Sequence, residues 1–231
     1  MRKFTIKNYN KGEYNWLRQI EDICLLDVSN SQSVYQQIEE RIDALTTRIT
    51  NVAVVSEDNL LIEEGTEYCH ELSRVPNKFI SIRQISVDRA NGILNGRGVD
   101  QLHSEEEMFE YIKRYGKMHY AKLISSFEST FPQNFDTPVN IVDWGCGQGL
   151  ATITLLEKYE SLDVRNITLV EPSEIVLKRA ALHCSKFTTS SKLKTVCKKL
   201  DDVVSSDIKV QRDVPTIHLF SNILDIDDYN S

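Results

Sequence analysis

Three glycines at alternating positions follow a short apolar segment in the second half of the chain. Residues 140–149 read Asn-Ile-Val-Asp-Trp-Gly-Cys-Gly-Gln-Gly and lead into Leu-Ala-Thr-Ile-Thr. Glycine suits such a segment because a tight strand-to-helix turn uses backbone angles closed to other residues. A ligand can also lie directly against the bare backbone. The pattern therefore predicts a strand, a ligand-binding turn and a helix whose first residues face the ligand.

The spacing of the glycines separates two classes of ligand. A dinucleotide-binding turn has the pattern G-x-G-x-x-G, whose third glycine would fall at Leu150. Here Gly145, Gly147 and Gly149 give G-x-G-x-G instead, and Asp143 stands two residues before the first glycine. The pattern therefore disfavours a nicotinamide-dependent oxidoreductase.

The segment from Asp143 to Gly149 resembles motif I of the class I S-adenosylmethionine-dependent methyltransferases, which have a Rossmann-like fold. The next apolar segment, Ile-Thr-Leu-Val, ends in Glu171, where the family places an acidic side chain that accepts hydrogen bonds from both ribose hydroxyls. Pro172 and Ser173 then open the next helix. The resemblance covers residues 138–226 and implies S-adenosyl-L-methionine as the cofactor.

Two later segments extend the resemblance. Asp201 and Asp202 resemble the family's acidic residue beside the adenine amino group, with Asp201 the better candidate. Residues 217–225 resemble the family's S-N-x-L-H segment at the substrate end of the sheet, with Asp225 where a histidine is common. Asn222 and Asp225 are therefore the candidates for contacting a substrate, and no catalytic residue is assigned. The resemblance implies cofactor binding by Asp143, Gly145, Cys146, Gly147, Gly149, Glu171, Pro172, Asp201, Asp202 and Ser221.

Several of these residues have a second interpretation. Asp143 either accepts hydrogen bonds from backbone amides of the glycine turn or contacts the methionine part of the cofactor, and both can hold. Cys146 needs only a small side chain at its position, so we do not expect a nucleophile there. His119 is either an ordinary helix histidine or a residue near the transferred methyl group. The five scattered cysteines include no C-x-x-C pair, which argues against disulfides and a structural metal site.

The elements around the turn alternate between strand and helix. Short apolar segments separated by helical ones predict a parallel sheet covered on both faces, which is a doubly wound α/β fold of about four strands. The expected strands are residues 139–143, 166–170, 193–197 and 216–220, and the expected helices are residues 150–159 and 173–187.

The residues before this domain are expected to be mainly helical. Apolar side chains at helical spacing predict a helix over residues 33–50, and Ser104 and Glu107 predict a capped start for a helix interrupted near Gly116. β-branched residues predict small strands within 51–62 and 79–85. We therefore divide the chain into a helical region over 1–130, a linker over 131–138 and a cofactor-binding domain over 139–231.

Length, charge and hydropathy limit the compartment and the partners that we expect for this protein. The 231 residues carry 27 basic and 34 acidic side chains, and no segment has the length of a membrane span or the form of a secretory signal. We therefore expect a cytoplasmic protein. The net charge of −7 disfavours nonspecific nucleic-acid binding, although seven basic residues between 178 and 199 keep RNA open as a methyl acceptor beside proteins and small molecules.

The length after the fourth expected strand is short for the family. A methyltransferase domain of this class has seven strands, and only ten residues follow Ser221. We expect either a fragment of a longer protein, which we favour, or a partner that covers the fourth strand's edge, or a degenerate domain. The leading hypothesis is a methyltransferase or its cofactor-binding fragment, and the alternative is an inactive scaffold or regulatory binding module.

Overall fold

The computed structural model of the protein describes residues 60–92, 94 and 101–221. All described residues belong to one compact unit, Ile49–Ile223, which is the second unit of the chain. The expected helix over 33–50, Asn222 and Asp225 lie outside the described residues. So do residues 51–59 of the strand expected within 51–62, and its described residues 60–62 are not in a strand. The division at residues 131–138 stays a prediction, and these residues lie inside the second unit.

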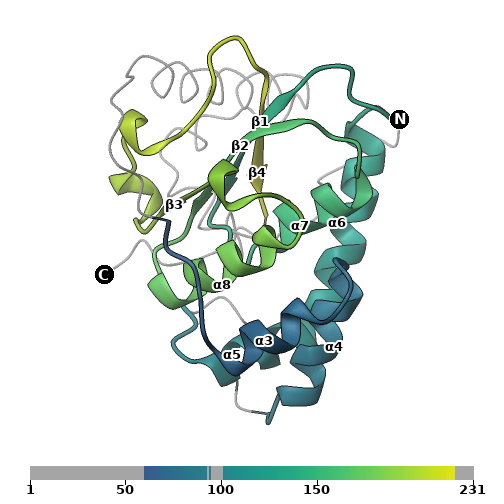
Figure 1. Cartoon of the computed structure of the whole chain (residues 1–231), viewed down its shortest axis with the longest axis vertical. Coiled ribbons are helices and arrows are strands. Elements are labelled where there is room, and N and C mark those ends of the chain that lie inside the picture. Colours follow the sequence, from purple (N-terminus) through teal and green to yellow (C-terminus); the bar gives the residue numbers. More distant parts are fainter. Residues whose placement is uncertain (1–59, 93, 95–100, 222–231) are drawn as a thin grey trace, which may run out of the picture. The chain divides into compact units, whose positions relative to one another are not determined.

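Four parallel strands form the sheet: β1 (Val139–Trp144), β2 (Val164–Val170), β3 (Leu193–Val196) and β4 (Thr216–Phe220). Their order across the sheet is β3-β2-β1-β4 (Figure 1). The chain therefore moves outward from β1 to β3 and then returns to the other side of β1. This order, with helical crossovers, is that of a Rossmann-like α/β sheet, so the predicted fold class is confirmed.

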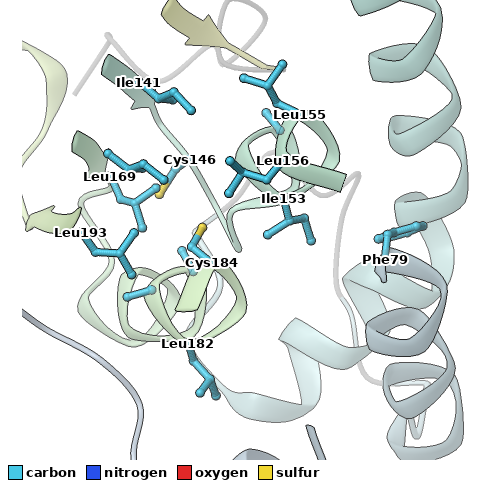
Figure 2. Packing of buried hydrophobic residues seen from close by; sticks show 14 of the residues in the cluster. Phe79, Ile141, Cys146, Ile153, Leu155, Leu156, Leu169, Leu182, Cys184 and Leu193 are labelled. Atoms are coloured by element: carbon cyan, nitrogen blue, oxygen red, sulfur yellow. The ribbon is translucent and has the colours of Figure 1, made fainter. Parts of the chain in front are cut away.

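Two helices cover one face of the sheet: α7 (Leu150–Lys158) and α8 (Glu174–Ser185). Alternate strand residues face them, because successive side chains of a strand point to opposite faces. Figure 2 shows Ile141, Leu169 and Leu193 from three strands in one core with side chains of α7 and α8. This core holds both helices against the sheet.

The opposite face is covered by the connection between β3 and β4. This connection contains two short 3₁₀ turns, Leu200–Asp202 and Ser205–Asp207, and places Ile208 against Val142, Val170 and Val196. Another 3₁₀ turn, Ser190–Lys192, precedes β3.

The buried amide of Asn140 holds the end of that connection against β1. Its Nδ2 donates to the backbone oxygens of Gln211 and Val214, both at 3.1 Å, and its Oδ1 accepts from the Gln211 amide and from Asn166. A buried amide with all these partners costs little to bury and allows one register for the returning chain.

The described residues before the sheet form α3 (Glu67–Ser73), α4 (Phe79–Arg89), α5 (Glu105–Tyr111) and α6 (Lys117–Thr130). A π-helical turn, Ile112–Gly116, joins α5 to α6 and is the predicted interruption near Gly116. Helix α6 lies beside α7 (Figure 1). The predicted cap is present in half: Ser104 Oγ accepts from the Glu107 amide, while the Glu107 carboxylate accepts from the His103 amide instead of that of Ser104.

The strand predicted over residues 79–85 is wrong, because these residues belong to α4. Phe79, Ile82 and Ile85 are buried at a spacing of three, so the apolar residues share one helix face. The Phe79 ring stacks on Tyr120, and its amide donates to a carboxylate oxygen of Glu157 at 2.9 Å. The glutamate that caps the start of α4 lies on α7. The local sequence, which is rich in β-branched residues, therefore could not indicate that a helix begins here.

One buried cation joins α8 to residues that precede the sheet in sequence. Arg179 has 1% side-chain exposure, bonds both carboxylate oxygens of Glu63 and donates to Glu105 at 3.0 Å. Its guanidinium carbon also lies 3.9 Å from the ring centre of Tyr68. A buried charge needs such neutralisation, so this cluster fixes Glu63, Tyr68 and Glu105 against α8.

We expect Arg179→Met to lower the free energy of unfolding by about 3–5 kcal/mol, because it leaves the Glu63 carboxylate buried without its counter-charge. Urea unfolding measures this loss. Lys178→Met is the matched control, since its ion pair with Glu174 is exposed and should change stability by less than about 0.5 kcal/mol. Equal effects of the two substitutions would contradict the role given to Arg179.

Candidate functional site

The glycine turn, residues 145–149, connects β1 to α7 at the carboxyl end of the sheet. Gly145, Gly147 and Gly149 have φ values of 59°, 51° and 78°, in the left-handed region that favours glycine. The Cys146 amide donates to the Val170 oxygen at 2.9 Å, so the turn begins against the end of β2. The strand order reverses at β1, and open α/β sheets bind ligands outside the strand ends at such a reversal.

The last two glycines of the turn serve different purposes. A Cβ on Gly149 would lie 3.2 Å from both the Ala180 oxygen and Cys184 Sγ, so this glycine lets α7 pack closely on α8. A Cβ on Gly147 would meet nothing within 4 Å. The backbone at Gly147 therefore borders open space into which a ligand can enter.

Glu171, directly after β2, reaches the glycine turn. Its two carboxylate oxygens accept hydrogen bonds from the amides of Gly147 and Ser173, each at 3.1 Å. Burial raises the pKa of Glu171, and these two amide bonds act against the rise. The carboxylate therefore lies beside the open space at Gly147, at the start of α8.

Asp143 lies beneath the turn and is fully buried. Its Oδ2 accepts from the Thr152 hydroxyl at 2.7 Å and from the Thr152 amide at 3.3 Å. Gly149, the residue that precedes α7, has no side chain, so the carboxylate of Asp143 caps this helix in its place. Its Oδ1 has no hydrogen-bond partner in the part of the chain that the structure describes.

Burial raises the pKa of Asp143 to about 7, and the two bonds from Thr152 offset only part of this rise. The same burial raises the pKa of the Cys146 thiol well above its usual value, with the carboxylates of Asp143 and Glu171 adding to it. Cys146 is therefore a neutral thiol, which suits a small packing residue rather than a nucleophile.

The other predicted cofactor residues lie around the same strand ends. Pro172 follows Glu171, and its backbone oxygen accepts from the Cys197 thiol at 3.5 Å, after β3. Asp201 and Asp202 are exposed on a 3₁₀ turn, and no hydrogen bond between described residues joins their side chains to the glycine turn. Ser221 is half-buried at the end of β4.

A hollow of about 440 Å³ lies between α6 and β4, with Ser221 on its wall. Its lining is mainly aromatic and apolar, with Phe127, Phe131 and Leu219 among its residues. His119 also lines it, with its own ring 5.9 Å from that of Tyr111. His119 is thus both a packed histidine and a residue of this hollow.

Two polar residues of the site were missed by sequence reasoning. Thr152 donates its hydroxyl and its amide to Asp143, and a threonine on a mainly apolar helix start was the available signal. Gln148, inside the turn, donates from Nε2 to the Met108 oxygen at 3.0 Å. Its partner lies 40 residues away, so the local sequence could not indicate it.

The described residues contain neither a metal-binding cluster nor a membrane-spanning helix. In residues 60–92, 94 and 101–221, no cluster of three or more His, Cys, Asp or Glu side chains has the arrangement of a metal site. No helix within these same ranges has the length and apolar character needed to cross a membrane.

Comparison with known proteins gives a weak match. No protein-family model matches the chain, and no curated protein matches it. A solved structure of geranyl diphosphate methyltransferase in complex with GPP and sinefungin matches with 14% identity and a TM-score of 0.33. The match covers 60% of this chain and 51% of that one, so the chain spans about half of that structure's length. A similarity this low supports no functional argument.

We expect Gly149→Ala to cost more stability than Gly147→Ala. Both introduce a side chain at a left-handed position, at about 1–2 kcal/mol, but only Gly149→Ala also forces a methyl group against α8, for about 1–3 kcal/mol more. Urea unfolding of the two variants tests this order. Equal losses would mean that Gly149 is not needed for the contact with α8.

The pKa of Asp143 predicts a dependence of stability on pH. Between about pH 4 and pH 7 the folded protein keeps a proton on Asp143 that the unfolded chain releases. This group's contribution to stability therefore falls as pH rises through that window, by up to about 1.4 kcal/mol per pH unit. The Asp143→Asn variant lacks this slope.

Unfolding free energies of the wild type and Asp143→Asn, measured at several pH values across this window, isolate Asp143 together with its coupling to Glu171, because titrations that are not coupled to Asp143 cancel in the difference. We expect the difference to move in favour of the variant as pH rises. A constant difference would contradict the raised pKa.

Proposed function

We propose that this protein binds S-adenosyl-L-methionine at the carboxyl ends of β1 and β2 and transfers its methyl group to an acceptor. One observation carries the proposal: the open backbone at Gly147 lies beside the Glu171 carboxylate, which accepts from the Gly147 amide at 3.1 Å. A nucleoside needs both features, a bare backbone to lie against and an acceptor for its ribose hydroxyls.

The residues present fit this cofactor. Gly145, Gly147 and Gly149 would supply backbone contact, and Glu171 would exchange its amide donors for ribose hydroxyls. When Asp143 is ionised, its unpaired Oδ1 is an acceptor suited to the ammonium of the methionine part. We assign the remaining contacts, as a proposal, to Cys146, Pro172, Asp201, Asp202 and Ser221.

Little chemistry is required of the protein itself. When bound, the cofactor supplies a sulfonium methyl group that is already activated for in-line displacement. The chain's residues would then orient the acceptor and exclude water, and a general base is needed only where the acceptor must lose a proton. Asn222 and Asp225 stay the candidates for acceptor contact, and the acceptor is a cytoplasmic protein, small molecule or RNA.

A second proposal is an inactive methyltransferase-like scaffold or regulatory binding module. Among the described residues β4 pairs only with β1, and Asp225 replaces the histidine common in the family's substrate segment. A partner or a further segment of a longer protein would then cover the β4 edge. Tight cofactor binding without turnover would favour this proposal.

Calorimetric titration with S-adenosylhomocysteine tests cofactor binding. We expect saturable binding by the wild type and its loss in Gly147→Arg, because the new side chain fills the open space at that position. NAD titration in parallel checks the dinucleotide alternative, for which we expect no binding.

Gly65→Arg is the matched control. Gly65 also has a positive φ, 69°, and open space around its Cα, but it is exposed ahead of α3. The control therefore carries the same backbone strain and charge and should bind as the wild type does. A folded wild type that does not bind S-adenosylhomocysteine would overturn the proposed function.

A further inference from the structure

We infer that Tyr68 and His183 are positioning residues for the glycine turn, so that the helical segment before the sheet forms part of the cofactor site. Tyr68 lies on α3 and His183 on α8, and together they connect α3 to the backbone of Gln148. The expected effect on cofactor affinity rests on the proposed function, whereas the expected effect on the rigidity of the glycine turn does not.

The protonation of His183 follows from its two partners. Its Nδ1 lies 2.8 Å from the Gln148 oxygen, and a carbonyl oxygen can only accept, so Nδ1 carries the proton. Complete burial lowers the pKa of His183 to about 3, so the ring is neutral and Nε2 is an acceptor. The Tyr68 hydroxyl, 2.6 Å away, therefore donates to Nε2.

The ring of Tyr68 is itself held in place. The guanidinium of Arg179 lies over its face, and the ring of Phe109 packs edge-on at 5.2 Å. Tyr68 is completely buried, and burial raises the pKa of its hydroxyl, so the donated proton stays on the oxygen. The hydroxyl therefore has one direction in which to donate.

The same peptide of the turn is held from a second side. The Gln148 side chain donates to the Met108 oxygen of α5, while its backbone oxygen accepts from His183. Gln148 separates Gly147, which borders the open space, from Gly149, which packs on α8. Holding this peptide in place therefore also sets the direction of the Gly147 backbone. The turn needs such support because its three left-handed glycines do not restrict their own backbone angles.

Tyr68→Phe removes the hydroxyl and keeps the ring, leaving His183 Nε2 without its donor. Tyr159→Phe is the matched control, since Tyr159 is also buried and its hydroxyl donates to the Phe127 oxygen at 3.3 Å. Tyr159 follows the far end of α7, about 13 Å along the helix from the turn.

Amide hydrogen exchange gives the readout that does not depend on any ligand. In Tyr68→Phe we expect faster exchange at the amides of Cys146, Gly147 and Gly149, and in Tyr159→Phe no change at these three amides. Melting temperatures should fall by similar amounts, a few degrees, in both variants. Unchanged exchange in a folded Tyr68→Phe protein would overturn the inference.

Calorimetry with S-adenosylhomocysteine gives the second readout. We expect Tyr68→Phe to weaken binding on the order of five- to tenfold and Tyr159→Phe to leave it unchanged. A wild type that does not bind overturns the proposed function, and the exchange result then decides the positioning role alone. If the wild type binds S-adenosylhomocysteine and Tyr68→Phe binds it with the same affinity, the inferred effect of Tyr68 on cofactor affinity is wrong.

Discussion

The buried guanidinium of Arg179 is the constraint on which the described structure depends. An ion removed from water must keep its counter-charges, and Arg179 finds these on Glu63 and Glu105, which lie outside the sheet domain in sequence. Glu63 and α5 therefore cannot move away from α8 without removing the counter-charges of this buried guanidinium. Because α8 begins beside Glu171 and ends near His183, fixing this helix also fixes both sides of the glycine turn.

The turn itself shows how a binding surface is made from backbone rather than from side chains. Glycine supplies the left-handed angles but no rigidity, so the rigidity must come from neighbours. Glu171 accepts from one amide of the turn, His183 donates to one of its oxygens, and Asp143 holds the helix that follows. Each of these contacts comes from a different element, so the surface exists only in the complete fold.

Local patterns were enough to predict the sheet domain. Apolar segments between turn residues marked all four strands and both covering helices to within about two residues, and the glycine spacing marked the turn. What failed depended on distant partners: α4 is capped by Glu157 of α7, and Tyr68 meets His183 across 115 residues. Single-sequence patterns carry propensity and period, but not the identity of a tertiary partner.

The π-helical turn between α5 and α6 has a consequence for how this chain can vary. Each residue added to or removed from a helix rotates everything after it by about 100°. The five residues of Ile112–Gly116 therefore set the rotation of α6 relative to α5. This rotation places the Met108 oxygen beside Gln148 and the Phe127 oxygen beside the Tyr159 hydroxyl. A π-helical turn takes up one residue more than the α-helical turn it replaces, so a one-residue deletion there would leave a continuous α-helix and keep the direction of α6. A one-residue deletion within α6 itself would instead turn the apolar face of α6 away from α7.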